Sequence, residues 1–118
     1  MLLELKATAL RGKGGEDIKD SDGNISYLQH DAWSLMMLFR SIDGLTQAPH
    51  MRVVMKLHDL FMEAWVADAV SVELDEESVT TMKTLLADPK DKFREGSTLL
   101  SDFTVQRTLL GVRDALGI

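Results

Sequence analysis

Three histidines are the side chains of this chain that titrate near neutral pH and are therefore best suited to acid–base chemistry: His30, His50 and His58. No two of them stand four residues apart, so the helical His-Glu-x-x-His arrangement of zinc proteases is absent. Asp59 follows His58, but neighbouring helical residues point about 100° apart, and we expect the carboxylate not to orient the imidazole. We predict no catalytic and no metal-binding histidine.

Two carboxylates, Asp59 and Glu63, stand four residues apart and would share one face of a helix. Such a pair serves acid–base catalysis when burial raises the pKa of one partner. Here Arg52 and Lys56 lie on the same face, where they compensate the negative charge. The pattern therefore favours a solvated, mixed-charge face over a catalytic pair.

An oxygen-rich turn contains the alternating residues Asp20, Asp22 and Asn24, and Asp31 follows the first of them by eleven positions. This spacing resembles half of a calcium-binding loop. The pattern then fails, because the glycine is fourth instead of sixth and the last ligand is Asp instead of Glu. A plain turn is the stronger interpretation, and a calcium site stays open as the alternative.

The sequence around these residues predicts strands first and helices afterwards. Residues 1–10 alternate apolar and polar side chains, which indicates a strand with one buried face. The glycines at positions 12, 14 and 15 predict a turn, and residues 18–28 predict a hairpin about Asp22-Gly23-Asn24. Together they make residues 1–28 a β-meander region.

Residues 31–118 are predicted to be mainly helical. Helices are expected over residues 31–42, with Asp31 as N-cap, and over 49–70, the longest stretch with one helical period. A short strand follows at 70–74, then a helix capped by Asp75 and closed at residues 88–89. A mixed-charge connector over 90–96 leads to a last helix, capped by Ser101 or Asp102, that ends at Gly117.

Length and composition favour one domain of the α+β class, a small N-terminal β-hairpin or meander packed with three to five helices. The chain has 118 residues, of which 45% are hydrophobic and 27% charged. The net charge of −6 argues against direct nucleic-acid binding, which needs a cationic face. Because no segment has the uninterrupted apolar length of a membrane span or the pattern of a secretory signal, we expect a cytoplasmic protein without a membrane partner.

Three segments, IKDSDGNIS, MKLHDLFMEA and VSVELDEESVTTMKTLLAD, stand in an order that resembles small phage-encoded α+β proteins of unassigned function. The resemblance rests on the order of elements over most of the chain, and it brings no catalytic residues. It implies an accessory or assembly protein in a bacterial cytoplasm, or in the virion.

More apolar helical surface is present than so short a chain is expected to hide, so the sequence predicts a non-enzymatic protein–protein interaction module that self-associates and binds one protein partner. No cofactor is expected. The predicted surface is drawn from the aromatic residues and methionines of the first two helices, for which core packing is the competing explanation: Trp33, Met36, Met37, Phe39, Met51, Met55, Met62 and Trp65. The alternative is a small acidic inhibitor that blocks a host enzyme or nucleic-acid-binding protein with an acidic face made of Asp59, Glu63, Glu73, Glu76 and Glu77.

Overall fold

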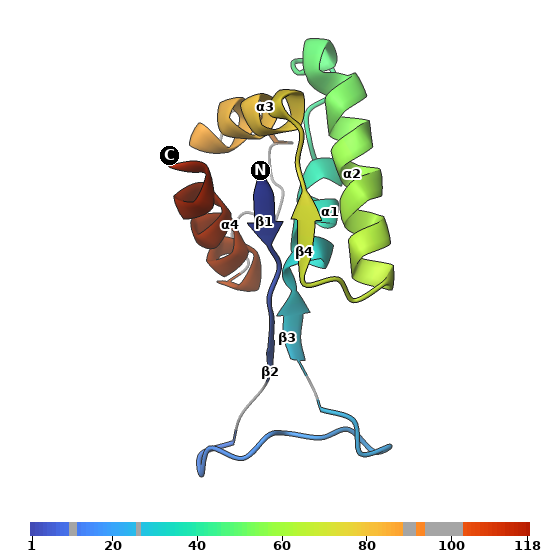
Figure 1. Cartoon of the computed structure of the whole chain (residues 1–118), viewed down its shortest axis with the longest axis vertical. Helices are drawn as coiled ribbons and strands as arrows, with labels where there is room; N and C mark the ends of the chain where they lie inside the picture. Colours follow the sequence, from blue (N-terminus) through green and yellow to red (C-terminus); the bar gives the residue numbers. More distant parts are fainter. Residues whose placement is uncertain (10–11, 26, 89–91, 94–102) are drawn as a thin grey trace.

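The computed structural model describes residues 1–9, 12–25, 27–88, 92–93 and 103–118. Strands and helices mix along the chain, which confirms the predicted α+β class (Figure 1). The elements are β1 (Leu2–Glu4), β2 (Ala7–Ala9), β3 (Tyr27–His30), α1 (Asp31–Arg40), the 3-10 turn η1 (Ala48–His50), α2 (Met51–Val66), β4 (Ser71–Glu73), α3 (Glu76–Ala87) and α4 (Phe103–Leu116).

The strand expected over residues 1–10 is divided into two short strands with different partners. β1 pairs antiparallel with β4, with Leu3 opposite Val72, whereas β2 pairs antiparallel with β3, with Ala7 opposite His30. The break falls at residues 5–6, where the Leu5 amide donates to Val70 O and the next amide turns to another partner. The predicted N-terminal hairpin is present as the antiparallel β2–β3 pair, whereas β1 finds its partner about 70 residues away, outside residues 1–28.

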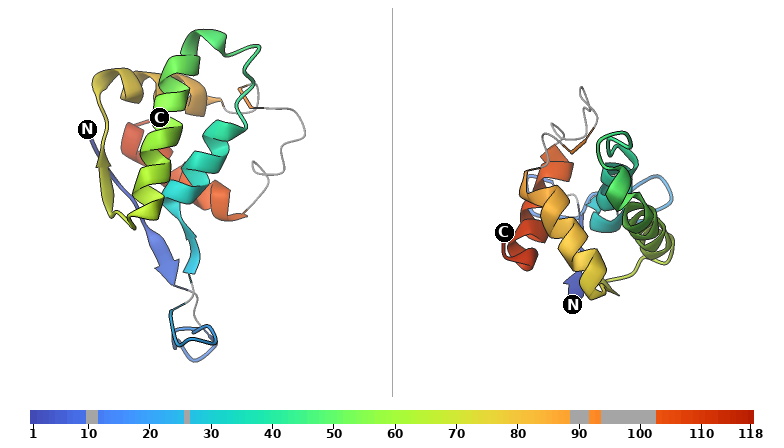
Figure 2. Two further views of the ribbon diagram at one scale, coloured as in Figure 1. Left: turned by 90° about the vertical axis from the view of Figure 1, so that its right-hand side faces the viewer. Right: turned by 90° about the horizontal axis from the view of Figure 1, so that it is seen from above.

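Residues 12–25 project from the β2–β3 ladder, at the end of the molecule away from α3 (Figures 1 and 2). The predicted glycine turn is confirmed by the bond from Gly15 N–H to Gly12 O, and Gly15 has the positive φ of 84° that glycine tolerates. In the predicted hairpin an antiparallel bridge joins Lys19 to Ile25 around the second turn. Position 26 of that hairpin lies outside the described residues.

The helices surround the β1–β4 sheet on three sides. α1 lies behind the sheet, α2 and α4 flank it, and α3 crosses at the end opposite the projecting segment (Figure 1). The long helix expected over 49–70 is confined to Met51–Val66, since η1 precedes it and Asp68 has a φ of 51° after it. Val105, Leu109 and Val112 of α4 recur at spacings of four and three, and this stripe is buried.

The helix ends follow the expected capping chemistry with one exception. Asp75 caps α3 by accepting a hydrogen bond from Ser78 N–H at 2.7 Å, as predicted. The N-cap of α1 is His30, one residue earlier than expected, because its Nδ1 accepts from Ala32 N–H at 3.0 Å. The predicted caps at 101–102, the stop at Pro89 and most of the 90–96 connector lie outside the described residues.

One core lies between the sheet and the four helices. Phe39 of α1 stacks on Phe61 of α2, with ring centroids 6.1 Å apart and planes within 5°. Met36 is also buried. The prediction that Met36 and Phe39 belong to an interaction surface was therefore wrong: α1 is covered by α2, by α4 and by the strands, so its apolar residues on those sides are enclosed.

Among the described residues no helix is both long enough and apolar enough to span a membrane.

Candidate functional site

The outer side of α2 carries an apolar stripe that the rest of the described chain leaves open. Met55 is 63% exposed, Met62 40% and Trp65 43%. Together with half-buried Met51 and His58 they recur at spacings of four, three, four and three. This is the spacing of a coiled-coil seam, about four helical turns long. We call the five residues Met51, Met55, His58, Met62 and Trp65 the α2 seam.

The structure thus divides the eight residues of the predicted interaction surface. Four of them, Met51, Met55, Met62 and Trp65, lie together on α2. Trp33 and Met37 are half-buried on α1 and pack against the core. His58, the fifth seam residue, was not among the predicted ones. The regular spacing of the methionines around it was the sequence signal for including it.

A pocket of about 320 Å³ lies beside the seam, between the end of α1 and the first half of α2. Arg40, Met55, His58 and Asp59 line it. The expectation that Asp59 does not orient its neighbour was wrong, because His58 Nδ1 lies 3.0 Å from Asp59 Oδ1. The other residues that line the pocket are apolar or lack a side chain: Phe39, Ile42, Gly44, Met51 and Val54. None of these lining residues offers a hydroxyl, thiol or amine nucleophile to the imidazole.

The five acidic residues of the alternative surface come from three elements, and cations lie among them. All five are exposed: Asp59, Glu63, Glu73, Glu76 and Glu77. Asp59 and Glu63 share the outer face of α2 with exposed Arg52 and Lys56, as predicted. The acidic groups are thus interleaved with positive charge.

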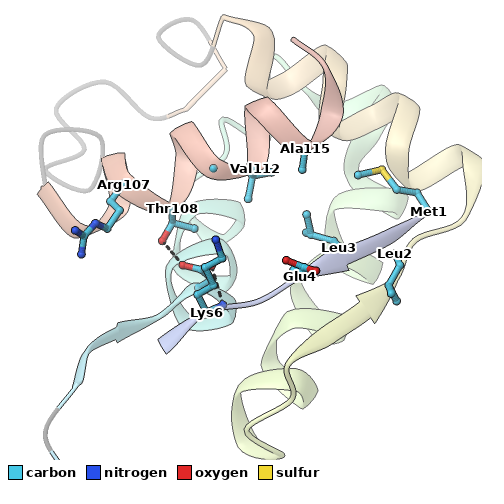
Figure 3. A pocket seen from close by; sticks show the side chains of 11 residues that line it. Met1, Leu2, Leu3, Glu4, Lys6, Arg107, Thr108, Val112 and Ala115 are labelled. Carbon is cyan, nitrogen blue, oxygen red and sulfur yellow. Dashed lines mark hydrogen bonds between the residues drawn. The ribbon is translucent and has the colours of Figure 1, made fainter. Parts of the chain in front are cut away.

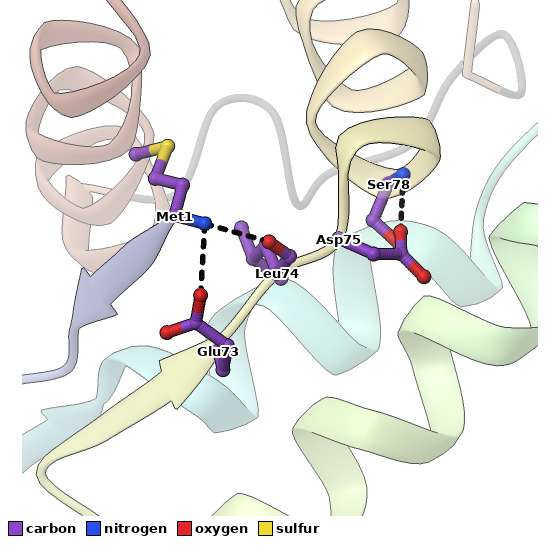
Figure 4. Close-up of polar contacts among 5 residues, drawn as sticks. All are labelled: Met1, Glu73, Leu74, Asp75 and Ser78. Carbon is purple, nitrogen blue, oxygen red and sulfur yellow. Dashed lines mark hydrogen bonds and ion pairs between the residues drawn. The ribbon is translucent and has the colours of Figure 1, made fainter.

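Lys56 of α2 and Asp75 form an ion pair at the β4–α3 corner (Figure 4 shows Asp75 and Ser78). Lys56 Nζ donates to Asp75 Oδ2, and the Asp75 carboxylate also accepts from Ser78 N–H. The hydrogen bonds from Lys56 and Ser78 hold the pKa of Asp75 well below its ordinary range. The hydrogen bond to Asp75 raises the pKa of Lys56. This carboxylate is ionised and structural.

Near the same corner, hydrogen bonds of Met1 extend the β1–β4 pairing by one residue at its end. The amino group of Met1 donates to Glu73 Oε1 at 3.0 Å and to Leu74 O at 2.8 Å (Figure 4). Leu74 N–H in turn donates to Met1 O at 2.7 Å. Glu73 is therefore engaged with the sheet and is a weaker candidate for an acidic docking face than its exposure suggests.

Asp31 and His30 hold the start of α1 against three other segments. Asp31 Oδ2 accepts from Lys6 N–H, and Asp31 Oδ1 accepts from the Thr108 hydroxyl, both at 2.9 Å. His30 Nε2 lies 3.1 Å from Ala69 O. The calcium alternative loses Asp31 as a ligand, since both oxygens of this carboxylate bind elsewhere.

The oxygen-rich turn itself is held by its own backbone. Asp20 Oδ1 accepts from Asp22 N–H at 2.9 Å and from Asn24 N–H at 3.0 Å. Gly23, with a φ of 84°, donates to Asp20 O. Across the described residues no group of three or more His, Cys, Asp or Glu side chains is placed to hold a metal ion. The hydrogen bonds expected of a turn are therefore present at Asp20, Asp22 and Asn24.

A second hollow, of about 550 Å³, lies between β1 and α4 (Figure 3). Leu3 and Val112 form its apolar part, and Lys6 and Arg107 lie at one end, opposite Met1. We call it the β1–α4 groove. This groove is not predictable from the sequence, because no local pattern shows that residues 2–4 and 107–115 are neighbours.

Comparison of the chain with protein-family models, with curated proteins and with solved structures finds no match.

Proposed function

We propose that the protein is a non-enzymatic protein–protein interaction module that self-associates through the α2 seam. The observation that carries this proposal is the run of exposed apolar side chains at heptad spacing along one helix. A methionine or tryptophan that stays in water loses the free energy of burial, about 25 cal/mol for each Å² of apolar surface. A contiguous stripe of them favours contact with a second apolar surface.

Charge complementarity makes a second copy of this chain the occupant. Arg52 and Asp59 flank the seam on one side, seven residues apart, and both are exposed. In an antiparallel pair of α2 helices, Met55 packs on His58 of the second copy and Met51 packs on Met62 of the second copy. Arg52 of each copy then lies beside Asp59 of the other, so two equivalent ion pairs flank the apolar contact.

The experiment is sedimentation velocity on the full chain. We expect a dimer at about 100 μM. A dissociation constant of about 100 μM corresponds to a dissociation free energy of roughly 5.5 kcal/mol. Met55→Asp should give a monomer, because it places a charge in the centre of the apolar contact. Leu110→Asp is the matched control, since Leu110 is exposed on α4, which flanks the other side of the sheet. A monomeric wild-type chain at that concentration would overturn the proposal.

Charge exchange tests the antiparallel register. Arg52→Asp alone and Asp59→Arg alone should each weaken the dimer, because each leaves like charges facing one another. The double variant should restore the dimer, because it recreates both ion pairs with their partners exchanged. Equal weakening in the double variant would exclude this register.

The biological setting follows from the resemblance to phage-encoded proteins, which supports an accessory or assembly role in a bacterial cytoplasm or a virion. The acidic inhibitor is the alternative, and no observation favours it over self-association. Salt separates the two: an acidic face should lose its partner steeply as the salt concentration rises, whereas the apolar seam should hold.

A further inference from the structure

The β1–α4 groove contains a strand edge. On either side of β1, odd-numbered residues use their backbone groups toward the β4 segment: Leu74 N–H donates to Met1 O, and Leu5 N–H donates to Val70 O. Backbone groups of successive strand residues point to opposite edges. The N–H and C=O groups of Leu2 and Glu4 therefore point away from β4, and in the described part of the chain they have no hydrogen-bond partner.

This open edge faces α4. At Lys6 the same edge is filled by Asp31, which accepts from Lys6 N–H and donates its own N–H to Lys6 O. Asp31 also accepts from Thr108 of α4, so the contact spans from the strand to the helix. Beyond it, toward Met1, the groove lies between the free edge and the helix (Figure 3).

The far wall of the groove leaves room for a backbone. Gly111 of α4 lines the groove, and a Cβ atom placed there would meet no atom within 4 Å. β1 has three residues, so an added strand would pair over about 10 Å, which is the length of three to four extended residues. The apolar floor at Leu3 and Val112 suits an aliphatic side chain of that strand.

The end of the groove near Asp31 is cationic. The side chains of Lys6 and Arg107 both lie there (Figure 3). Within the described residues, neither side chain has an ion-pair partner. Two acids also line the groove: Asp31 uses both of its oxygens on the Lys6 amide and the Thr108 hydroxyl, and Glu4 lies on β1 between Lys6 and Met1 (Figure 3). A carboxylate on the ligand would satisfy both cations.

We propose that the β1–α4 groove binds an extended peptide, which adds to β1 as a further strand and places a carboxylate between Lys6 and Arg107. Backbone hydrogen bonds to Leu2 and Glu4 supply register, the apolar floor accepts one aliphatic side chain, and the two cations select an acidic residue or a free C-terminus. This site is separate from the α2 seam and does not depend on self-association.

The probe is a displayed library of random peptides about seven residues long, long enough to cover the edge. Selection uses the full wild-type chain, and each selected peptide is then measured against Gly111→Leu, in which the new side chain fills the groove. Gly111→Ala is the matched control, because its methyl group meets open space and leaves the groove passable. We expect selected peptides to contain an acidic residue, to bind Gly111→Ala and to lose binding to Gly111→Leu by at least about tenfold.

Backbone pairing is tested on one selected peptide by N-methylation. A methyl group on the alternate amides that face β1 should abolish binding, whereas methylation of the intervening amides should leave it within about threefold. The Lys6→Gln and Arg107→Gln double variant should weaken binding by at least about tenfold. Amide signals of Leu2, Glu4 and Gly111 should move when the peptide is titrated.

Three results would overturn the inference. They are a library that yields no peptide dependent on an open groove, binding that tolerates every N-methylation, and selected peptides without a carboxylate. The Met55→Asp protein should bind the same peptide with unchanged affinity. A failure of self-association and a failure of peptide binding are therefore distinguishable.

Discussion

The hydroxyl of Thr108 donates to Asp31 Oδ1 at 2.9 Å, across 77 positions of sequence. The second oxygen of the same carboxylate accepts from Lys6 N–H. One side chain at the start of α1 therefore joins the N-terminal strand segment, the first helix and the last helix. The hydrogen bonds of Asp31 to Lys6 and Thr108 tie α4 to the segment after β1, and the β1–α4 groove lies beside them, between β1 and α4.

Removing the hydroxyl should destabilise the fold. In Thr108→Val, Asp31 Oδ1 loses its partner in a partly buried place, and we expect the free energy of unfolding to fall by about 1–3 kcal/mol. Chemical denaturation measures this. Thr84→Val is the control, since the Thr84 hydroxyl bonds to Thr80 O on the exposed side of α3 and should matter by less than about 0.5 kcal/mol. Equal effects of the two variants would contradict a joining role for Asp31.

Two histidines precede helices, and only one caps with its side chain. His30 Nδ1 accepts from Ala32 N–H, whereas His50 makes no side-chain bond at the start of α2. We expect His30→Ala to lower the free energy of unfolding by about 1–2 kcal/mol. His50→Ala should change it by less than about 0.5 kcal/mol. His30→Asn keeps a capping acceptor and should recover part of the lost stability. If it recovers none, the loss comes mainly from the hydrogen bond to Ala69 O and not from the cap.

The tautomer of His30 is a separate expectation. Because Nδ1 accepts from Ala32 N–H and Nε2 faces Ala69 O, the hydrogen bonds require the tautomer with its proton on Nε2. Nitrogen NMR of the labelled imidazole at pH 8 should show this tautomer. A proton on Nδ1 would contradict the capping geometry.

Because of the Lys56–Asp75 ion pair, we expect the stability of the fold to fall in acid. The pKa of Asp75 is lower in the folded chain than the ordinary value of about 3.9, so the pair stabilises the fold above that pH. This contribution is lost as the pH falls through the folded-state pKa. Asp75→Asn keeps a capping acceptor but has no charge. The difference in Tm between wild type and Asp75→Asn should therefore narrow on acidification from pH 7 to pH 2, as measured by circular dichroism.

The contribution of Lys56 to stability is lost at high pH instead of at low pH. The pKa of Lys56 is raised in the folded chain, so its contribution is complete below about pH 10.4 and is lost as the pH rises through the folded-state value. Lys56→Gln should remove the alkaline dependence and weaken the acidic one, because the hydrogen bond from Ser78 N–H still lowers the pKa of Asp75. A Tm difference between wild type and Asp75→Asn that stays constant over the acid range would show that the ion pair does not act on stability.

The α2 seam has one polar residue at its centre. A polar side chain in an apolar seam weakens association while it sets the register. We therefore expect His58→Leu to tighten self-association by at least about tenfold, measured by sedimentation equilibrium. Lys83→Leu, which adds an exposed leucine on α3, is the control for nonspecific adhesion and should leave the dissociation constant unchanged. Equal tightening in both would argue against a specific seam.

The helices were predictable to within a few residues because their signals are local. The stripe of α4 from Val105 to Val112 and the cap of α3 at Asp75 depend on positions three or four residues apart. The cap of α1 was misplaced by one residue because His30 and Asp31 both carry an acceptor near the first turn. Only the bond to Ala32 N–H decides between them.

The strand pairing and the exposed faces were not predictable in the same way. Alternation in residues 1–10 indicates a strand but does not say that Leu3 lies opposite Val72 and Ala7 opposite His30. Likewise, Met36 and Met55 are equally apolar in the sequence. Met36 is enclosed because other elements pack over its side of α1, whereas Met55 faces outward from α2. These outcomes depend on contacts between distant segments.

The change of partner after Leu5 has a consequence for synthesis on the ribosome. Leu2–Glu4 emerge well before Ser71–Glu73, with which they pair. At a translation rate of about 5–20 residues per second, this interval is roughly 4–14 s. Ala7–Ala9 wait a shorter time, since Tyr27–His30 follow soon after. The β2–β3 hairpin can therefore form while the nascent chain is still short, whereas Leu3 and Leu5 stay in contact with water, or with a chaperone, until much later.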